Sequence, residues 1–198
     1  MTQQTTLTPA SGYETVRAAI AYLSEVGPDA LDLDRFARAL GLTERQLVSH
    51  FRDWCGLTPK SFAQAVALDH AKALLRERES VLSTTYEVGL SSTSRLHDLF
   101  VTYEAMPPGV FRAKGEGIDM TWGAAPSPFG IAVITATSYG ISGIGFADTE
   151  EDIGEGFEDL ANRWPRARFT RDDGKIAPLA ARVFDPAKWD PERPVRIV

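Results

Sequence analysis

Four residues that follow a glycine turn could contact a nucleic acid directly, through hydrogen bonds or through apolar contacts. Arg45, Val48, Ser49 and Arg52 share one face of a predicted helix with Glu44, and Leu47 and Phe51 lie on the opposite, inward face. A guanidinium can bond two acceptors of guanine at once, an aliphatic side chain can contact a thymine methyl group, and a hydroxyl can bond a base or a phosphate. These residue types predict that the helix reads base edges in the major groove of double-stranded DNA, with Arg45 as the main base reader.

The elements that would position this face form a helix-turn-helix. Such a motif needs a small residue where the two helices cross, a glycine at the turn and an aliphatic residue that anchors the second helix. Ala37, Gly41 and Leu47 supply these at intervals of four and six. Asp32 can cap the first helix, predicted over 33–40, and Thr43 with Gln46 forms a capping box at the start of the second.

Two further helices flank this motif. The apolar spacing of Val16, Ile20 and Leu23 predicts a helix over 13–26 that ends at Gly27-Pro28. Downstream, Thr58 can cap a helix that has Pro59 at its first position and continues to about Arg78. The segment 60–77 would be roughly 27 Å long at about 1.5 Å per residue. If the recognition helices are also displaced sideways at its two ends, they would lie nearly 34 Å apart, which is the distance between successive major grooves.

The same pattern returns later in the chain. Phe51 recurs as Phe100, and Leu47, Pro59 and Phe62 likewise recur 49 residues on, whereas Gly41 and Gly89 are 48 apart. An imperfect repeat of this kind predicts two recognition helices. The candidate DNA contacts in the second copy are Thr93, Ser94, Arg95 and His97. Asp98 on that face and Thr85 at the helix crossing predict that the second copy contributes less specificity.

Residues 13–112 resemble the AraC-type DNA-binding domain. The motifs that carry the resemblance are Gly41-Leu42-Thr43, 56–62, 68–75, 87–91 and Pro108-Gly109-Val110-Phe111-Arg112. The resemblance implies transcription regulation through two recognition helices. The positions matching the family's base-contacting residues are Arg45, Val48, Ser49, Thr93, Ser94, Arg95 and His97.

Beyond Arg112 the hydrophobic pattern changes from helical to strand-like, after a short linker at 115–117. Strands are predicted over 120–124, 131–137 and 141–146 as an antiparallel meander. A helix capped by Asp148 or Thr149, with the stripe Ile153, Phe157, Leu160 and Trp164, follows, and a short helix over 177–184 comes next. The fold class is therefore α+β. It comprises a disordered arm (1–12), an all-α tandem helix-turn-helix domain (13–114) and a small α/β domain with the meander (118–198).

Residues 118–198 are similar to the ribonuclease-H-like N-terminal part of an Ada-type methylated-DNA-protein cysteine methyltransferase, through Pro128-Phe129-Gly130, 135–145 and Trp164-Pro165. The resemblance implies a link to alkylation repair. That family's chemistry needs a thiolate in a Pro-Cys-His-Arg motif, which this chain lacks. Because the chain stops at Val198, we expect either a truncated parent enzyme or a form that has lost catalysis, and no activity from this chain alone.

Composition restricts the remaining possibilities. The net charge is −6, and the first 114 residues are nearly neutral, so DNA affinity would depend on local cations and non-specific binding should be weak. A single cysteine, Cys55, excludes internal disulfides and multi-cysteine zinc sites, and lone Cys55 beside Trp54 is typical of packing. His50, His70 and His97 have no ligand-type neighbours, so no metal or cofactor is expected.

The expected setting is the cytoplasm, because neither a signal peptide nor a membrane span is found in the sequence. The expected partner is double-stranded DNA. RNA polymerase is an alternative partner for the acidic C-terminal half, whose charge equally fits a solvated surface. The operator, the inducing signal, the sign of regulation and the oligomeric state are not encoded in any pattern of this chain.

Overall fold

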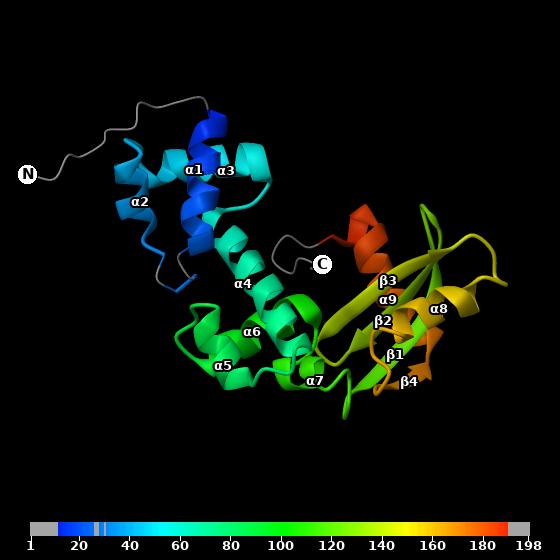
Figure 1. The fold of residues 1–198 in the computed structure, drawn as a ribbon. Helices are drawn as coiled ribbons and strands as arrows, with labels where there is room; N and C mark the ends of the chain where they lie inside the picture. The colour runs from blue at the N-terminus through cyan, green and yellow to red at the C-terminus, as the bar shows by residue number, and fades with distance from the viewer. Residues whose placement is uncertain (1–11, 26–27, 30, 190–198) are drawn as a thin grey trace, which may run out of the picture. The chain divides into compact units, whose positions relative to one another are not determined.

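The computed structural model describes residues 12–25, 28–29 and 31–189 (Figure 1). The predicted arm over 1–12 and the predicted stop at Gly27 lie largely outside these ranges, as does the chain end. The chain divides into two compact units, an N-terminal unit that ends at Arg95 and a C-terminal unit that begins at Leu96. The domain boundaries given above stay predictions. Within the described ranges, no helix combines the length and the apolar character needed to cross a membrane.

The N-terminal unit is helical. Its elements are α1 (Gly12–Glu25), α2 (Leu33–Ala39), α3 (Glu44–Cys55), α4 (Pro59–Arg76) and α5 (Val81–Glu87). Figure 1 shows α1, α2 and α3 grouped together, with α4 extending away from them. The boundaries agree within two residues with the helices predicted from apolar spacing, because caps and glycine stops mark most of the ends.

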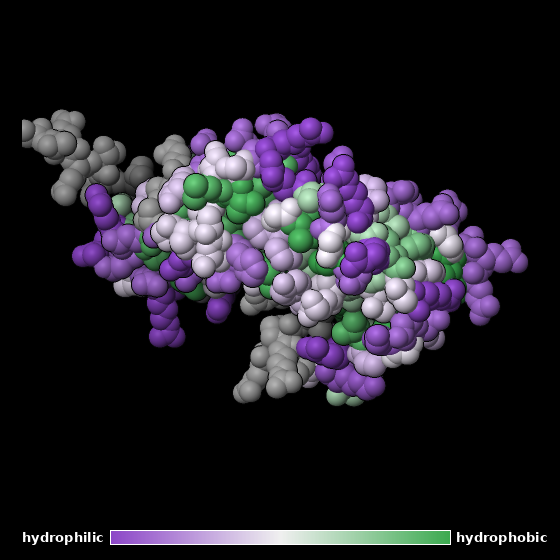
Figure 2. Space-filling model, turned by 90° about the horizontal axis from the view of Figure 1, so that it is seen from below, coloured by the Kyte–Doolittle hydropathy of each residue, from purple (hydrophilic) through white to green (hydrophobic). Residues whose placement is uncertain are grey.

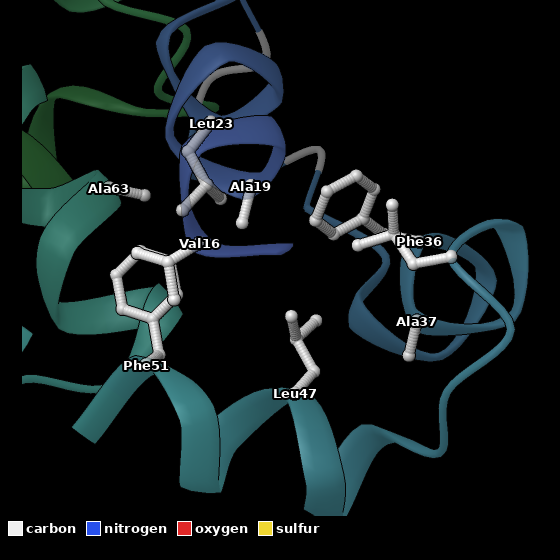
Figure 3. Close-up of a cluster of buried hydrophobic side chains, with 9 residues drawn as sticks. Val16, Ala19, Leu23, Phe36, Ala37, Leu47, Phe51 and Ala63 are labelled. Atoms are coloured by element: carbon white, nitrogen blue, oxygen red, sulfur yellow. The ribbon is translucent and has the colours of Figure 1, made fainter. Parts of the chain in front are cut away.

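One hydrophobic core holds α1 to α4 together (Figure 3). Side chains from all four helices point toward one another: Val16, Ala19, Leu23, Phe36, Ala37, Leu40, Leu47, Phe51 and Ala63. The rings of Tyr22 and Phe36 stack with centroids 4.1 Å apart. The small residue Ala37 is fully buried, in agreement with its predicted place at the helix crossing.

The predicted caps of this unit are present. Asp32 accepts a hydrogen bond from the backbone N–H of Arg35, 2.9 Å away, and Thr58 accepts one from Ser61. At the start of α3, Thr43 accepts from the N–H of Gln46 while the Gln46 side chain accepts from the N–H of Thr43. The capping box is thus complete, and two backbone donors that would otherwise be unpaired are satisfied.

The C-terminal unit combines helices with a sheet. It contains most of α6 (Thr93–Glu104), then α7 (Pro108–Arg112), β1 (Asp119–Ser127), β2 (Gly130–Thr137), β3 (Gly140–Ala147), α8 (Ile153–Ala161), β4 (Arg168–Arg171), α9 (Asp173–Phe184) and the 3-10 turn η1 (Pro186–Lys188). The strand order is β3-β2-β1-β4. The pairs β1–β2 and β2–β3 are antiparallel, and β4 pairs with β1 in parallel. The sheet is therefore mixed.

Helices cover both faces of the sheet. Successive residues of β2 point to opposite sides, since Ile134 packs with Ile176 of α9 and Val133 packs with Leu160 of α8. Glycine makes the close approach possible at two places. A Cβ on Gly123 would lie 2.7 Å from Asp173 Oδ1, and one on Gly143 would lie 3.1 Å from Leu160. The small domain is thus a three-layer arrangement of helix, sheet and helix.

Three details differ from the prediction. β4 was not expected, because four residues with two arginines show no strand pattern long enough to be distinguished from a loop. α9 begins at Asp173 rather than near 177, since Asp172 caps it and Pro178 lies inside it. At α8 the residue before the helix is Asp152, whose side chain accepts hydrogen bonds from Thr149, so neither Asp148 nor Thr149 is the cap.

The predicted linker at 115–117 is packed at its first residue, whereas Glu116 and Gly117 are exposed. Gly115 adopts a φ of +87°, and a Cβ there would lie 2.9 Å from Cβ of Ala167. The backbone N–H of Arg166 bonds the carbonyl of Lys114 at 3.1 Å. Phe111 of α7 meets Trp164 edge to face, with centroids 5.3 Å apart. Within the C-terminal unit, α7 and the sheet domain are therefore in direct contact.

Candidate nucleic-acid interface

The first candidate surface is the outward face of α3. Leu47 and Phe51 are fully buried and fix the rotation of the helix about its axis. Arg45, Ser49 and Arg52 are consequently exposed, and Val48 is half-buried. All four predicted DNA contacts of the first copy therefore lie on one accessible face.

This face borders an open depression of about 570 Å³. Its lining residues all come from α3, and they are Glu44, Arg45, Val48, Ser49, Arg52 and Asp53. Within the described part of the chain, neither Arg45 nor Arg52 forms an ion pair. Their guanidinium donors are thus available to an external acceptor such as a base edge or a phosphate.

The second candidate surface is the outward face of α6. Leu96 and Phe100 are buried, as Leu47 and Phe51 are in α3. The four predicted contacts Thr93, Ser94, Arg95 and His97 are exposed. Asp98, which the sequence analysis singled out as unfavourable, is also exposed and lies 3.6 Å from Nδ1 of His97. The assignment of these side chains to DNA stays a prediction.

The turns that precede α3 and α6 have the same backbone geometry. Gly41 and Gly89 have φ angles of +71° and +73°, a conformation that favours glycine. The N–H of Leu42 bonds the carbonyl of Ala37 at 2.9 Å, and that of Leu90 bonds the carbonyl of Thr85 at 3.0 Å. The larger Thr85 therefore leaves the turn unchanged, and its hydroxyl donates to the carbonyl of Val81 at 2.7 Å.

Arg95 differs from Arg45 in having an internal partner. Its Nη1 lies 3.2 Å from Oδ1 of Asp29, a residue of the segment between α1 and α2. The other carboxylate oxygen accepts hydrogen bonds from the N–H and the hydroxyl of Ser91, at 2.8 and 2.6 Å. Sequence reasoning missed Asp29 because it lies in an irregular segment 62 residues before its partner, without any periodic signal.

The ionisation of Asp29 follows from these contacts. Burial raises the pKa of the carboxyl, but the hydrogen bonds from Ser91 and the charges of Arg95 and Lys60 together outweigh it. The net pKa lies below its usual value. Asp29 is therefore ionised at neutral pH and acts as a fixed negative charge beside the first turn of α6.

A second depression lies on the sheet domain. Its volume is about 510 Å³, and its lining includes Trp122, Glu150 and Arg171. Trp122 stacks on Phe157 with centroids 3.9 Å apart, and the Arg171 guanidinium lies 5.0 Å from the Trp122 ring. Arg171 also pairs with Asp173 at 3.2 Å. These groups satisfy one another through cation–π and ionic contacts.

The potential metal ligands and the single cysteine were located in the same way. In the described part of the chain, no three His, Cys, Asp or Glu side chains gather as a metal site would require. Cys55 is half-buried at the end of α3 and packs against the core of the N-terminal unit. This position agrees with the packing role predicted for it.

Comparison with known proteins finds matches to the helical part of the chain. Residues 36–114 match the family described as a helix-turn-helix domain. The chain is 27% identical over 88 residues to the HTH-type transcriptional regulator MtrA of Neisseria gonorrhoeae, a match that covers 44% of this chain and 29% of that protein. The chain thus spans less than a third of the length of this curated relative.

Solved structures with similarity to the chain include a transcriptional regulator and a DNA-binding domain. One is a transcriptional regulator of the AraC-type DNA-binding domain-containing proteins from Chromobacterium violaceum, with a TM-score of 0.46, 21% identity, and coverage of 53% of this chain and 95% of that one. The other is the DNA-binding domain of AdpA, a global transcriptional factor, in complex with a target DNA. It has a TM-score of 0.44, 23% identity, and coverage of 54% and 92%.

Proposed function

We propose that this chain is a sequence-specific DNA-binding transcription regulator of the AraC type, in keeping with the match of residues 36–114 to a helix-turn-helix domain. The observation that carries the proposal is the outward face of α3. It presents two arginines without internal ion-pair partners among the described residues, on a helix held rigidly by Leu47, Phe51 and a complete capping box. Such a face is suited to the major groove.

Each side chain of this face has a distinct task in the proposal. Arg45, in the first turn of α3, donates two hydrogen bonds to O6 and N7 of a guanine. Val48 contacts a thymine methyl group, and Ser49 bonds a base or a phosphate. Arg52, two turns further along, pairs with a phosphate and so contributes affinity without sequence information.

The second recognition helix extends the site on the DNA. Thr93, Ser94, Arg95 and His97 would contact a second major groove about 34 Å along the duplex. The intervening helix α4 has 18 residues and is therefore roughly 27 Å long. One copy of the chain would read an asymmetric site, with DNA bending that costs on the order of 1–6 kcal/mol.

The test is a footprint over genomic fragments, followed by binding of single-base variants of the protected site. Arg45→Ala should weaken binding to the cognate site by about 1–3 kcal/mol with little loss on random DNA. The matched control is Arg17→Ala, since Arg17 is an exposed arginine of α1 that pairs with Glu14. An absence of sequence preference at every salt concentration would refute the proposal, and an equal loss on all sequences would refute the base-reading role of Arg45.

The sheet domain suggests a setting for this regulation. We propose that residues 118–198 connect the regulator to the alkylation response, which rests on the resemblance of 128–130, 135–145 and 164–165 to an Ada-type methyltransferase. The alternative is that the chain is part of the enzyme itself. Reading the coding DNA beyond codon 198 separates them. About a hundred further residues that contain a Pro-Cys-His-Arg motif would favour the enzyme, and a stop codon would favour the regulator.

A further inference from the structure

In the second helix-turn-helix, an arginine stands where the first has the glutamine of its capping box, and this arginine contacts Asp29. When Leu47 is superposed in sequence on Leu96, Gln46 corresponds to Arg95. In the first copy, the Gln46 side chain accepts the backbone N–H of Thr43 at 2.9 Å and completes the capping box. Arginine has no acceptor, so the second copy cannot form this bond with its own side chain.

The carboxylate of Asp29 binds next to this cap. At the same spacing of 49, Thr43 corresponds to Ser92, whose hydroxyl accepts the N–H of Arg95 at 3.4 Å, and Asp29 contacts the preceding residue, Ser91. Oδ2 accepts from both the N–H and the hydroxyl of Ser91, and Oδ1 pairs with Nη1 of Arg95. The Asp29 side chain is only 17% exposed, so these charge-assisted bonds are partly shielded from solvent. Lys60 at the start of α4 adds a further positive charge nearby.

The contact leaves most of the Arg95 guanidinium available. Its side chain is 59% exposed, and Nη1 lies 3.2 Å from the carboxylate of Asp29. A guanidinium has five N–H donors in a fixed fork. A carboxylate on one edge therefore restricts the rotamers of the side chain while the other donors remain accessible.

We infer that Asp29 is a positioning residue for base reading by the second recognition helix. It fixes Ser91 before α6, orients Arg95 in the first turn, and thereby sets the base preference of the second half-site. The inference rests on the proposed function. It assigns the specificity of that half-site in part to a residue outside both helix-turn-helix motifs.

The experiment measures single-base discrimination in each half-site with the full chain and its footprinted DNA. Asp29→Asn keeps the shape of the side chain and removes its charge. Discrimination in the second half-site should fall by roughly fivefold or more, the range of a lost specific contact, while the first half-site is unchanged. Non-specific affinity should stay equal or rise, because a negative charge near the DNA is lost.

Asp34→Asn is the matched control. Asp34 is an exposed aspartate of the nearby helix α2 that pairs with Arg38, so its replacement removes the same charge without touching Ser91 or Arg95. It should leave discrimination unchanged in both half-sites. Ser91→Ala provides a second, independent variant that removes only the hydroxyl contact, and it should reduce discrimination in the second half-site in the same direction.

The outcomes separate this inference from the proposed function. If Arg45→Ala reduces specificity while Asp29→Asn and Ser91→Ala do not, the positioning role is refuted and the DNA-binding function stands. Equal losses in both half-sites, together with a lower melting temperature, would indicate a purely structural role and also refute it. If the wild-type chain shows no footprint, the proposed function itself fails.

Discussion

The ring of Phe100 meets the ring of Phe111 edge to face, with centroids 5.2 Å apart and planes inclined by 72°. The pair 49 positions earlier, Phe51 and Phe62, has nearly the same arrangement, at 5.5 Å and 68°. The sequence repeat is thus reproduced as a repeat of packing geometry. The aromatic pair joins α3 to α4 in the first copy and α6 to α7 in the second.

The second aromatic pair has an additional neighbour, and this predicts a cooperative loss of stability. Phe111 also contacts Trp164, so Phe111→Ala should lower the free energy of unfolding by about 3–5 kcal/mol. A double-mutant cycle with Trp164→Ala should reveal a coupling of about 0.5–1.5 kcal/mol. Chemical denaturation of the four proteins measures it. Strict additivity would mean that the two rings do not interact in solution.

The capping box at α3 predicts a smaller and local effect. Thr43→Ala removes the acceptor for the N–H of Gln46 and should cost about 1 kcal/mol of stability. Thr43→Ser retains the hydroxyl and serves as the control, with little expected change. Urea denaturation distinguishes the two. A similar cost for both substitutions would show that the methyl group rather than the hydrogen bond stabilises the helix.

The sequence predicted the helices far better than the contacts between distant segments. Caps such as Asp32, Thr43 and Thr58 act within three residues, so their signals are local and the boundaries of α2, α3 and α4 could be predicted closely. β4 exists because β1 pairs with it in parallel, and its own four residues carry too little pattern. Asp29 was not predicted for the same reason, since it contacts Ser91, which lies 62 positions further along the chain, and Arg95.

The composition of the surface also does not predict which residues form the candidate interface. Figure 2 shows hydrophilic side chains interspersed with hydrophobic ones on the visible face. The near-neutral charge of the first 114 residues did not reveal that Arg45 and Arg52 lack internal ion-pair partners in the described part of the chain, whereas Arg95 has one. That difference depends on the fold, because it is decided by which carboxylates the folded chain brings near each guanidinium.

Two glycines of the sheet domain predict opposite effects of the same substitution. Gly123→Ala would place a methyl group 2.7 Å from Asp173 Oδ1 and 3.0 Å from its Cα, and should destabilise the protein by about 1–3 kcal/mol through overpacking. Gly154 lies in the first turn of α8 with open space around it. Gly154→Ala should stabilise the helix by up to about 1 kcal/mol. Thermal melting of both variants tests the packing, and a stable Gly123→Ala protein would contradict it.

Arg52 predicts a salt-dependent effect on DNA binding. If it pairs with a phosphate, Arg52→Ala should weaken binding uniformly across sequences and reduce the slope of log affinity against log salt by about 1. Base discrimination should remain as in the wild type, in contrast to Arg45→Ala. Titrations at several salt concentrations on cognate and random DNA provide the measurement. A loss of discrimination would instead place Arg52 at a base edge.

The ionised carboxylate of Asp29 makes stability depend on pH in the acid range. Because its pKa is lower in the folded chain than the usual value near 3.8, its stabilising contribution is complete above that value and is lost as the pH falls through the folded-state pKa. The stability difference between wild type and Asp29→Asn should therefore be largest near neutral pH and shrink below about pH 4. Urea denaturation at a series of pH values measures this difference directly.

Asp119→Asn is the comparison: a hydrogen bond from Arg168 lowers the pKa of Asp119, but this carboxyl is fully exposed. In about 1 M salt, where the screening length is about 3 Å, the loss of stability caused by Asp119→Asn should become small. The loss caused by Asp29→Asn should remain largely unchanged, because the contacts of Asp29 are shielded from solvent. A difference for Asp29→Asn that stays constant down to the most acidic pH would show that its charge does not contribute.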